Sequence, residues 1–434
     1  MTIAVVPYDP EWPREFERES NRLRAALGDI AIRIDHHGST SVPGLAAKPI
    51  IDIQISVERL QPLEPYASAL AGLGYTHVPH ADDSFAPFFH RPATWPHTHH
   101  VHVVSAGGAE ERRTLRFRDR LRSDDGLARE YEALKRQLAD AANGSDFVAQ
   151  QAYANAKTDF IERAIAGAEV SAYYDGFEEE HRLASGPSQL EGDRTKEIVA
   201  RHLPPPAARI LDVGGAAGVY SLWLAALGHE VHLVDASARL VEEARRRSDR
   251  AARPLASASV GDARQLSQQD AAFDVVIVMG PLYHLTQAAD RARALAEAFR
   301  VLRPGGFFAA AGISRYASAM DGLAQNFSLD PMFVAIRDRD LADGQHRNDS
   351  GHPYYFTTAY FHTPDGFRDE VAAAGFSRVQ VLGVEGPAWI LGDFDKRWAD
   401  PALRAVILDT ARVLESHAPI VAASAHLLAI GWKA

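Results

Sequence analysis

The chain has 434 residues, too many for one ordinary hydrophobic core, which favours two domains or one domain with a large insertion. It has no cysteine, which excludes disulfides, a thiolate nucleophile and cysteine-based zinc sites, and its formal charge of −11 disfavours nonspecific binding to nucleic acid or anionic lipid. No run approaches the roughly 18 apolar residues of a membrane span, so we expect a cytoplasmic protein without a membrane partner.

The first 168 residues combine helical and strand-like patterns. Helical spacing of apolar residues predicts helices at Glu11–Leu27, Leu60–Leu73, Glu110–Asn143 and Ala152–Ala168. Strand-like runs occur at Ala31–Asp35, Pro49–Val57 and His99–Val104. The small residues of Ala166–Ser171 are typical of a linker. We therefore predict an N-terminal α+β domain over residues 1–168 and a second domain over residues 173–434.

After residue 200 the pattern changes to alternating strands and helices. Strands are predicted at Arg209–Val213, Val231–Val234, Phe273–Met279, Phe307–Ile313, Val379–Val384 and His426–Gly431. Helices are predicted at Val219–Leu227, Leu240–Arg247, Asp290–Leu302, Pro364–Ala374 and Ala402–Ser416. Repeated βα units predict an α/β domain, with a doubly wound parallel sheet and helices on both of its faces.

A glycine-rich turn joins the first of these strands to the first helix. It contains Gly214, Gly215 and Gly218, and glycines let the backbone turn sharply and approach a cofactor closely. Asp235 ends the next strand, at the place where a carboxylate accepts hydrogen bonds from both hydroxyls of a ribose. This arrangement suits either a dinucleotide or S-adenosylmethionine, and the acid that opens the turn, Asp212, favours the latter.

These features resemble the class I S-adenosylmethionine-dependent methyltransferases, whose first motif begins with an acid and carries three glycines at alternate positions. The middle glycine is Ala216 here, and later motifs follow in order at Gly261–Ala263, Phe273–Gly280 and Val301–Gly306. The resemblance implies a Rossmann-like, seven-stranded fold that uses S-adenosylmethionine and releases S-adenosylhomocysteine. The cofactor-binding residues that it implies are Tyr174, Arg194, Asp212, Gly214, Gly215, Gly218, Asp235, Asp262, Ala263 and Met279.

The methyl acceptor is expected where Pro281–Leu285 follows the fourth strand. His284 is a candidate base for an amine or a hydroxyl, and Tyr283 is a candidate for positioning the acceptor; the alternative is that His284 only supports the structure or the cofactor. An insertion near residues 315–363 is predicted to form an acceptor-binding lid, because so long a connection usually has a function. It carries His362, a second candidate base, and aromatic residues that alternatively form the lid's own core.

The N-terminal domain carries a second set of motifs, which resemble the GrpB family across nearly all of residues 1–165. These motifs are Tyr8–Pro13, His37–Ile53, His99–Val104, Leu115–Asp119 and Tyr153–Lys157. The family belongs structurally with the nucleotidyltransferases, in which a Gly-Ser turn cradles phosphate and acids on the next strand hold Mg²⁺. The candidate site residues are Gly38, Ser39, Lys48, Asp52, His100 and His102.

A metal in the N-terminal domain is one of two interpretations. The second acid expected on the strand is replaced by Gln54, which argues against a Mg²⁺ pair. Asp52, His100 and His102 would suit a softer ion through mixed nitrogen and oxygen ligands. The favoured alternative is a domain that binds a nucleotide or substrate, or that only scaffolds the enzyme, so no metal ligand is assigned.

The favoured function is N- or O-methylation of a small-molecule acceptor, for example in specialised metabolism, with the N-terminal domain assisting. An RNA-directed methyltransferase is an alternative, but the acidic balance and the lack of an Asn/Asp-Pro-Pro-aromatic motif at Gly280–Leu285 make a nucleic-acid partner a poor match. The third interpretation is a non-catalytic regulator that binds S-adenosylmethionine.

Overall fold

The computed structural model describes residues 5–79, 86–141, 157–158, 160–166, 183, 185–348, 350, 352 and 354–434. The chain divides by its internal contacts into two compact units, Met1–Ala168 and Glu169–Ala434. None of the described helices is both long and apolar enough to cross a bilayer. Most of the helix predicted at Ala152–Ala168, and the predicted cofactor residue Tyr174, lie outside the described residues.

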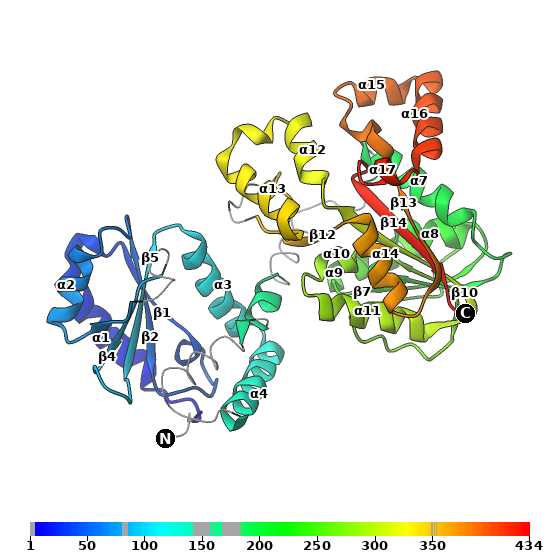
Figure 1. Ribbon diagram of the computed structural model, residues 1–434. Helices are drawn as coiled ribbons and strands as arrows, with labels where there is room; N and C mark the ends of the chain where they lie inside the picture. Colours follow the sequence, from blue (N-terminus) through cyan, green and yellow to red (C-terminus); the bar gives the residue numbers. More distant parts are fainter. Residues whose placement is uncertain are drawn as a thin grey trace. The chain divides into compact units, whose positions relative to one another are not determined.

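The N-terminal unit is built on a five-stranded sheet in the order β1-β2-β5-β4-β3 (Figure 1). Its strands are β1 (Arg33–His37), β2 (Ile51–Val57), β3 (Thr76–His77), β4 (Phe88–Arg91) and β5 (His99–Ser105). The central pair, β2 and β5, is parallel, while β1 and β4 run antiparallel to their neighbours. The pairing places Asp52 opposite both His37 and His100, so two of the candidate site residues, Asp52 and His100, lie in one row across the sheet with His37.

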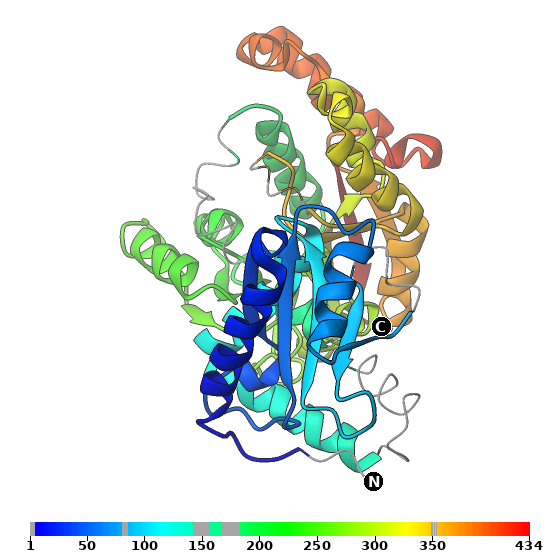
Figure 2. The ribbon, with the colours of Figure 1, turned by 90° about the vertical axis from the view of Figure 1, so that its left-hand side faces the viewer.

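Helices pack on both faces of this sheet. Alternate residues of β2, such as Ile51 and Ile53, are fully buried in a core with α1 (Trp12–Leu27) and α2 (Glu64–Gly72), which lie side by side in Figure 2. The remaining helices are α3 (Ala109–Ser123) and α4 (Asp125–Ala141). The prediction of one helix over Glu110–Asn143 was wrong, because Asp124 adopts an extended conformation and its carboxylate accepts a hydrogen bond from Leu127 N–H in the first turn of α4.

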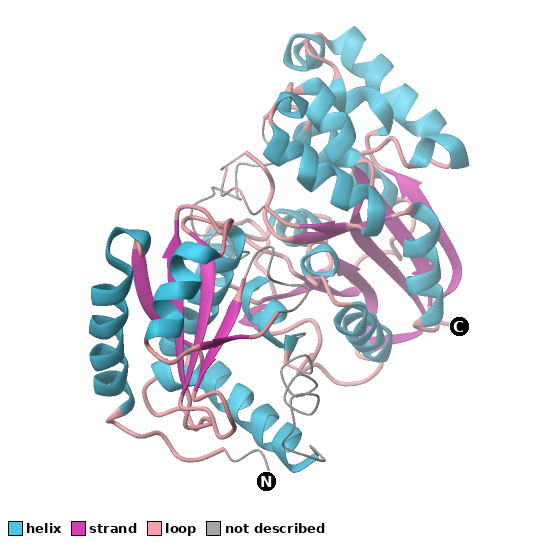
Figure 3. Cartoon of the chain, turned by 60° about the vertical axis from the view of Figure 1, so that its left-hand side comes forward, coloured by secondary structure: helices cyan, strands magenta, loops and turns pink. Residues whose placement is uncertain are grey.

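The C-terminal unit has a larger, mostly parallel sheet with helices on both sides (Figure 3). Its main strands are β6 (Arg209–Val213), β7 (Glu230–Asp235), β8 (Ser257–Val260), β9 (Phe273–Val278), β10 (Leu302–Ser314), β13 (Ser377–Gly383) and β14 (His426–Trp432). These seven follow the order β8-β7-β6-β9-β10-β14-β13. The last strand is antiparallel, because β14 lies between β10 and β13 and runs against both.

Alternation along the strands divides the core of this unit into two layers. On β10, Phe307 and Ala309 pack towards α7 (Ser188–Ala200) and α8 (Val219–Ala226), with α9 (Ala238–Asp249) beside them. Phe308 and Ala310 pack on the other face, towards α11 (Ala288–Val301) and α14 (Pro364–Ala373). The doubly wound α/β fold predicted for the second domain is thereby confirmed.

The insertion after β10 is mainly helical. It contains α12 (Ala317–Ala324), η5 (Phe327–Leu329), α13 (Pro331–Asp343), β11 (Gln345–His346) and β12 (Ala359–His362). Phe333, Ile336 and Tyr355 form a small core within the insertion. This agrees with the alternative prediction that aromatic residues of the insertion pack against one another. Between β13 and β14 lie η6 (Gly386–Ile390), α15 (Phe394–Ala399), α16 (Pro401–Leu414) and α17 (Ala418–Val421).

Candidate functional site

The glycine turn lies between the carboxyl end of β6 and the start of α8. Gly214 has φ +75°, and a Cβ atom there would lie 2.3 Å from Cδ of Pro281. A Cβ on Gly215 would lie 2.7 Å from Leu233 Cδ1, and Gly218 has φ +82°. Side chains are excluded from this turn by close packing as well as by backbone conformation.

Gly214→Ala is expected to destabilise the protein by about 2–4 kcal/mol, since left-handed strain and a steric overlap add. The matched control is Gly305→Ala, because Gly305 has φ +76° but no atom within 4 Å of its ideal Cβ. Thermal or denaturant unfolding of both variants isolates the overlap with Pro281. Equal losses in the two variants would show that this packing contributes nothing.

Asp235 holds the glycine turn in place from the end of β7. Its Oδ2 accepts a hydrogen bond from Ala216 N–H at 2.9 Å, and its Oδ1 accepts one from Ser237 N–H at 2.8 Å. Burial raises the pKa of this carboxyl. Asp262 lies nearby, because Gly261 N–H donates to the Asp235 carbonyl at 2.9 Å. Predicted cofactor residues from three separate motifs therefore meet at one edge of the sheet.

Asp212 is fully buried beneath the same turn. Ser221 Oγ donates to its Oδ2 at 2.5 Å, while its Oδ1 has no hydrogen-bond partner among the described residues. Burial raises the pKa of Asp212 to about 7. A buried, unsatisfied carboxylate oxygen costs free energy that an incoming cation would recover. The residues therefore fit S-adenosylmethionine, whose ammonium group would donate a hydrogen bond to Asp212.

The pKa of Asp212 makes stability depend on pH. In the unfolded chain this carboxyl titrates near 3.9, so as pH falls through about 7 the folded state takes up a proton that the unfolded state does not. Its contribution to stability is thus largest at low pH and is lost as pH rises. Without cofactor, Asp212→Asn should melt above the wild type at pH 8, and the gap should shrink at pH 5. An equal difference in melting temperature at pH 8 and pH 5 would contradict the raised pKa of Asp212.

A cavity of about 340 Å³, including the part open to solvent, lies at the carboxyl ends of the parallel strands. Residues from distant parts of the C-terminal unit line it, among them Glu191, Tyr220, Met279, Tyr283, Ala311 and His426. Met279 and Tyr283 are two of the predicted site residues, from the turn after β9 and from α10 (Pro281–His284). The acceptor position expected after the fourth strand thus opens onto this cavity.

The two predicted bases lie elsewhere. His284 stacks on Phe356 and is hydrogen-bonded to the backbone of Thr358, and burial lowers its pKa to about 4. His362 is 1% exposed, and its Nε2 lies 3.3 Å from Glu370, which Arg291 also binds at 2.7 Å. Neither histidine lines the cavity in the described part of the chain.

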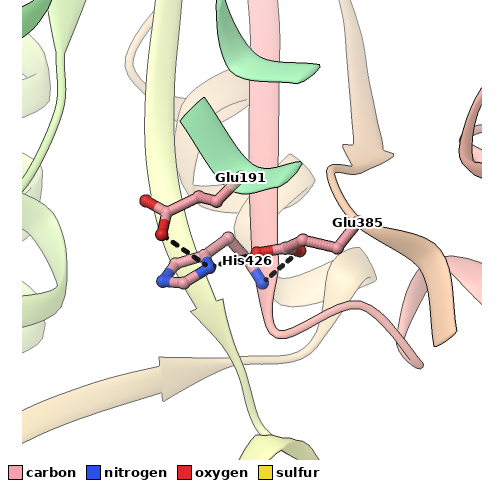
Figure 4. Close-up of side chains that lie close together, drawn as sticks. All are labelled: Glu191, Glu385 and His426. Atoms are coloured by element: carbon pink, nitrogen blue, oxygen red, sulfur yellow. Dashed lines mark hydrogen bonds and ion pairs between the residues drawn. The ribbon is translucent and has the colours of Figure 1, made fainter. Parts of the chain in front are cut away.

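Three residues that the motifs did not single out meet beside the cavity instead. His426 Nδ1 lies 2.5 Å from Glu385 Oε1 and 3.7 Å from Glu191 Oε2 (Figure 4). Among the described residues, these form the one set of three His or acidic side chains whose ligand atoms all lie within 4.8 Å of one another. A signal for two of them was present, since Glu385 follows one predicted strand and His426 begins the antiparallel one, which places both at the same sheet edge.

Arg194, predicted to contact the cofactor, is fully buried in an ion-pair network. It pairs with Glu197 at 2.6 Å and with Glu415, and both acids also pair with Arg201. This network ties α7 to the segment that follows α16. A role for Arg194 at the cofactor carboxylate stays a prediction, as does that of Tyr174.

In the N-terminal unit, the predicted turn packs directly on the predicted acid. Gly38 has φ +66°, and a Cβ atom there would lie 2.3 Å from Asp52 Oδ2, with Ser39 opening the following 3₁₀ turn. Burial alone would raise the pKa of Asp52, but the nearby histidines His100, His37 and His102 hold it well below its usual range. His100 Nδ1 lies 3.4 Å from Asp52, yet Asp52, His100 and His102 do not form a compact set of ligand atoms within the described ranges.

Comparisons with known proteins agree with this geometry. A family model described as a GrpB protein matches residues 2–166, and one described as a methyltransferase domain matches residues 210–306. A UPF0157 protein of Halalkalibacterium halodurans is 40% identical over 37% of this chain and 80% of its own length. A UPF0157 protein of Bacillus subtilis is 35% identical over 37% of this chain, which spans 46% of that relative.

Among solved structures, an S-adenosylmethionine-dependent methyltransferase of Mesorhizobium loti is 18% identical, covering 56% of this chain and 100% of its own, with a TM-score of 0.39. The fold and the site of the C-terminal unit define a methyltransferase domain that uses S-adenosylmethionine. Through its N-terminal unit the chain belongs to the GrpB family.

Proposed function

We propose that the C-terminal unit transfers a methyl group to a small molecule bound in the cavity. The observation that supports this proposal is the position of the cavity, which Met279 and Tyr283 reach from the turn where class I methyltransferases are expected to present their acceptor.

Within this proposal the chain mainly binds, orients and excludes water. S-adenosylmethionine supplies a methyl group already activated on a sulfonium. Asp235 would accept hydrogen bonds from its ribose hydroxyls, and Asp212 would accept one from its ammonium group through Oδ1. Tyr283 would orient the acceptor, while the buried Leu428 keeps water from the floor of the cavity.

The test is to incubate the full chain with methyl-tritiated S-adenosylmethionine and two separate acceptor pools, an ultrafiltered metabolite extract and total tRNA. We expect label in the metabolite pool alone. Label in tRNA alone would replace the proposal by RNA methylation. Saturable binding of S-adenosylmethionine with no transfer to either pool would reduce the unit to a cofactor-binding regulator.

For the N-terminal unit we propose binding of a phosphate-bearing ligand such as a nucleotide. Three amines interact electrostatically with Asp52: burial, together with the Lys157 charge, lowers the pKa of Lys48 to about 8 and that of Lys135 to about 7, and burial lowers the pKa of Lys157 itself. Crowded, partly desolvated cations beside the Gly38 turn favour an anion.

Calorimetric titration of the full chain with ATP and Mg²⁺ tests this second proposal. Lys48→Met should weaken binding at least about tenfold, because it removes a charge-assisted hydrogen bond. Lys396→Met, a change at an exposed lysine of the C-terminal unit, should have no effect. An equal effect of the two variants, or absence of ATP binding by the wild type, would overturn it.

A further inference from the structure

One face of the N-terminal sheet carries a row of histidines beside a carboxylate. The strand pairing puts His37, Asp52, His100 and His90 in this row, while the core with α1 and α2 lies on the other face. The loop between β4 and β5 adds His97, whose ring stacks on that of His90 with centroids 3.9 Å apart. Residues from β1, β2, β4, β5 and this loop therefore meet on one face.

Asp52 and His100 form the first link of a hydrogen-bonded chain. Burial raises the pKa of Asp52, but hydrogen bonding from His100 and the charges of nearby histidines hold it well below its usual range. The ionised carboxylate only accepts hydrogen bonds, and its Oδ1 lies 3.4 Å from His100 Nδ1. An uncharged imidazole carries one proton, so a proton on Nδ1 leaves Nε2 of His100 as an acceptor.

His97 is the second link of this chain. Its Nδ1 lies 3.1 Å from His100 Nε2, so His97 donates its Nδ1 proton and keeps a lone pair on Nε2. Burial, together with the charges of His90 and His100, lowers the pKa of His97 to about 4, which leaves the ring uncharged at neutral pH. The side chain is partly exposed, so a reactant can reach a ring that an imidazole and a carboxylate support.

Aromatic neighbours fix the orientation of His97. His90 stacks on it with an angle of 11° between the rings, and Trp95 meets it edge-on with centroids 5.2 Å apart. His90 is itself anchored, because its Nδ1 lies 2.9 Å from the carbonyl oxygen of Pro92. A ring that is already held in place loses little freedom when it reacts.

The same carboxylate connects these histidines to the Gly38 turn. Gly38 packs on Asp52 Oδ2, while Oδ1 faces His100. On this face, His37 Nε2 and Gln54 Nε2 are buried with no hydrogen-bond partner among the described residues. Buried nitrogen atoms without a partner cost free energy, which the oxygen atoms of a phosphate would recover.

We infer that His97 Nε2 is a nucleophile that takes up a phosphoryl or nucleotidyl group from a phosphoanhydride. This inference rests on the proposal that the N-terminal unit binds a phosphate-bearing ligand. The Nε2 lone pair forms the bond to phosphorus as a P–O bond of the anhydride breaks, and the electron pair of that bond stays on the leaving oxygen. The Nδ1 proton of His97 passes to His100 Nε2, and Asp52 balances the charge of the resulting imidazolium.

The first test measures the reactivity of His97 with phosphoramidate, a small phosphoryl donor that needs no nucleotide site. The full chain reacts in one vessel with N-acetylhistidine, and peptide mass spectrometry locates the phosphate. At pH 7, His97 should react at least about tenfold faster than N-acetylhistidine and than His417, an exposed histidine of the C-terminal unit. A rate no higher than that of either reference would overturn the inference.

The dependence of this reaction on pH is a further readout. Free imidazole protonates at about pH 6.5, whereas His97 stays uncharged down to about pH 4. The ratio of the His97 rate to the N-acetylhistidine rate should therefore rise as pH falls from 7 to 5. A constant or falling ratio would overturn the inference.

The second test supplies the phosphoanhydride as ATP with Mg²⁺, labelled at the γ- or the α-phosphate. We expect label that is lost in acid and stable in alkali, as N–P bonds are, and the label that stays shows which phosphorus is attacked. His97→Asn should remove it and His417→Asn should retain it. If His97→Asn does not fold, mass spectrometry of the labelled wild type decides, and label on another residue would overturn the inference.

The role of His100 is tested by chemical rescue. In His100→Ala, labelling of His97 by ATP should fall about tenfold or more, because no base takes up the Nδ1 proton. Added imidazole should restore part of the rate, which would not happen if His100 only supported the fold. A lower rate without any recovery would overturn the proton transfer to His100.

Three outcomes separate this inference from the proposed ligand. ATP binding without faster reaction of His97 with phosphoramidate would overturn the inference and leave the binding proposal intact. Selective phosphorylation of His97 in a chain that does not bind ATP would overturn the proposed nucleotide alone. Saturable Zn²⁺ binding that His97→Asn abolishes would make these histidines a metal site and overturn the inference.

Discussion

Replacing His426, which lines the cavity and contacts Glu385 through Nδ1, by asparagine is expected to lower the rate of methyl transfer about 10²–10⁴-fold, the contribution of a positioned general base. Asparagine keeps a donor for Glu385 but has no proton acceptor equivalent to Nε2. Binding of S-adenosylmethionine should persist, because Asp212 and Asp235 are untouched. The measurement pairs initial rates on the labelled metabolite fraction with calorimetry of the cofactor.

The controls for this prediction are His284→Asn and His362→Asn. Neither residue lines the cavity, and His362 is bonded to Glu370, so its variant should lose stability and retain turnover when assayed below its melting temperature. A rate loss in His284→Asn as large as that in His426→Asn would return the base to His284 in α10. Glu385→Gln should lower kcat without raising KM, as a residue that only orients the imidazole would.

Asp235→Ala is expected to weaken binding of S-adenosylmethionine at least about 100-fold, since two hydrogen bonds to a charged acceptor are each worth roughly 1.5–3 kcal/mol. The loss has two sources. The ribose hydroxyls lose their acceptor, and the glycine turn loses the bond from Ala216 N–H that fixes its shape. Equilibrium titration with S-adenosylhomocysteine measures the effect directly.

The matched control for Asp235→Ala is Glu230→Gln, at the opposite end of the same strand. Glu230 is exposed and pairs with Arg209 and His232, far along β7 from the turn. It should leave affinity unchanged. An Asp235→Ala protein that binds the cofactor as tightly as the wild type would show that the ribose is held by other groups.

The order of strands and helices in the C-terminal unit was predictable, because parallel strands buried on both faces appear in the sequence as short apolar runs. The strand Arg209–Val213 was predicted to the residue, and Phe273–Met279 to within one. The edge strand β8 was missed, since Ser257–Val260 alternates polar and small residues and is only partly buried. Asp124 was missed as a helix break, because local spacing alone does not show where a chain turns.

The cofactor side of the site followed from one local segment, whereas the acceptor side did not. Asp212, Gly214 and Asp235 lie within two consecutive βα units, so their proximity follows from the strand order. Glu191 and His426 are 235 positions apart in the chain: the first lies on α7, and the second is placed by the pairing of β14 with β10, opposite Ile313. Motif spacing carries no information on such a register.

That register has a consequence for how the protein is made. Since β14 fills the gap between β10 and β13, the ribosome must release residues up to Trp432 before the sheet can close. The glycine turn between β6 and α8 leaves the ribosome some two hundred residues earlier, and the neighbouring strands β7 and β9 follow soon after it. Synthesis thus separates the two sides of the candidate site in time: a nascent chain can assemble the glycine turn first and gains the cavity-lining His426 last.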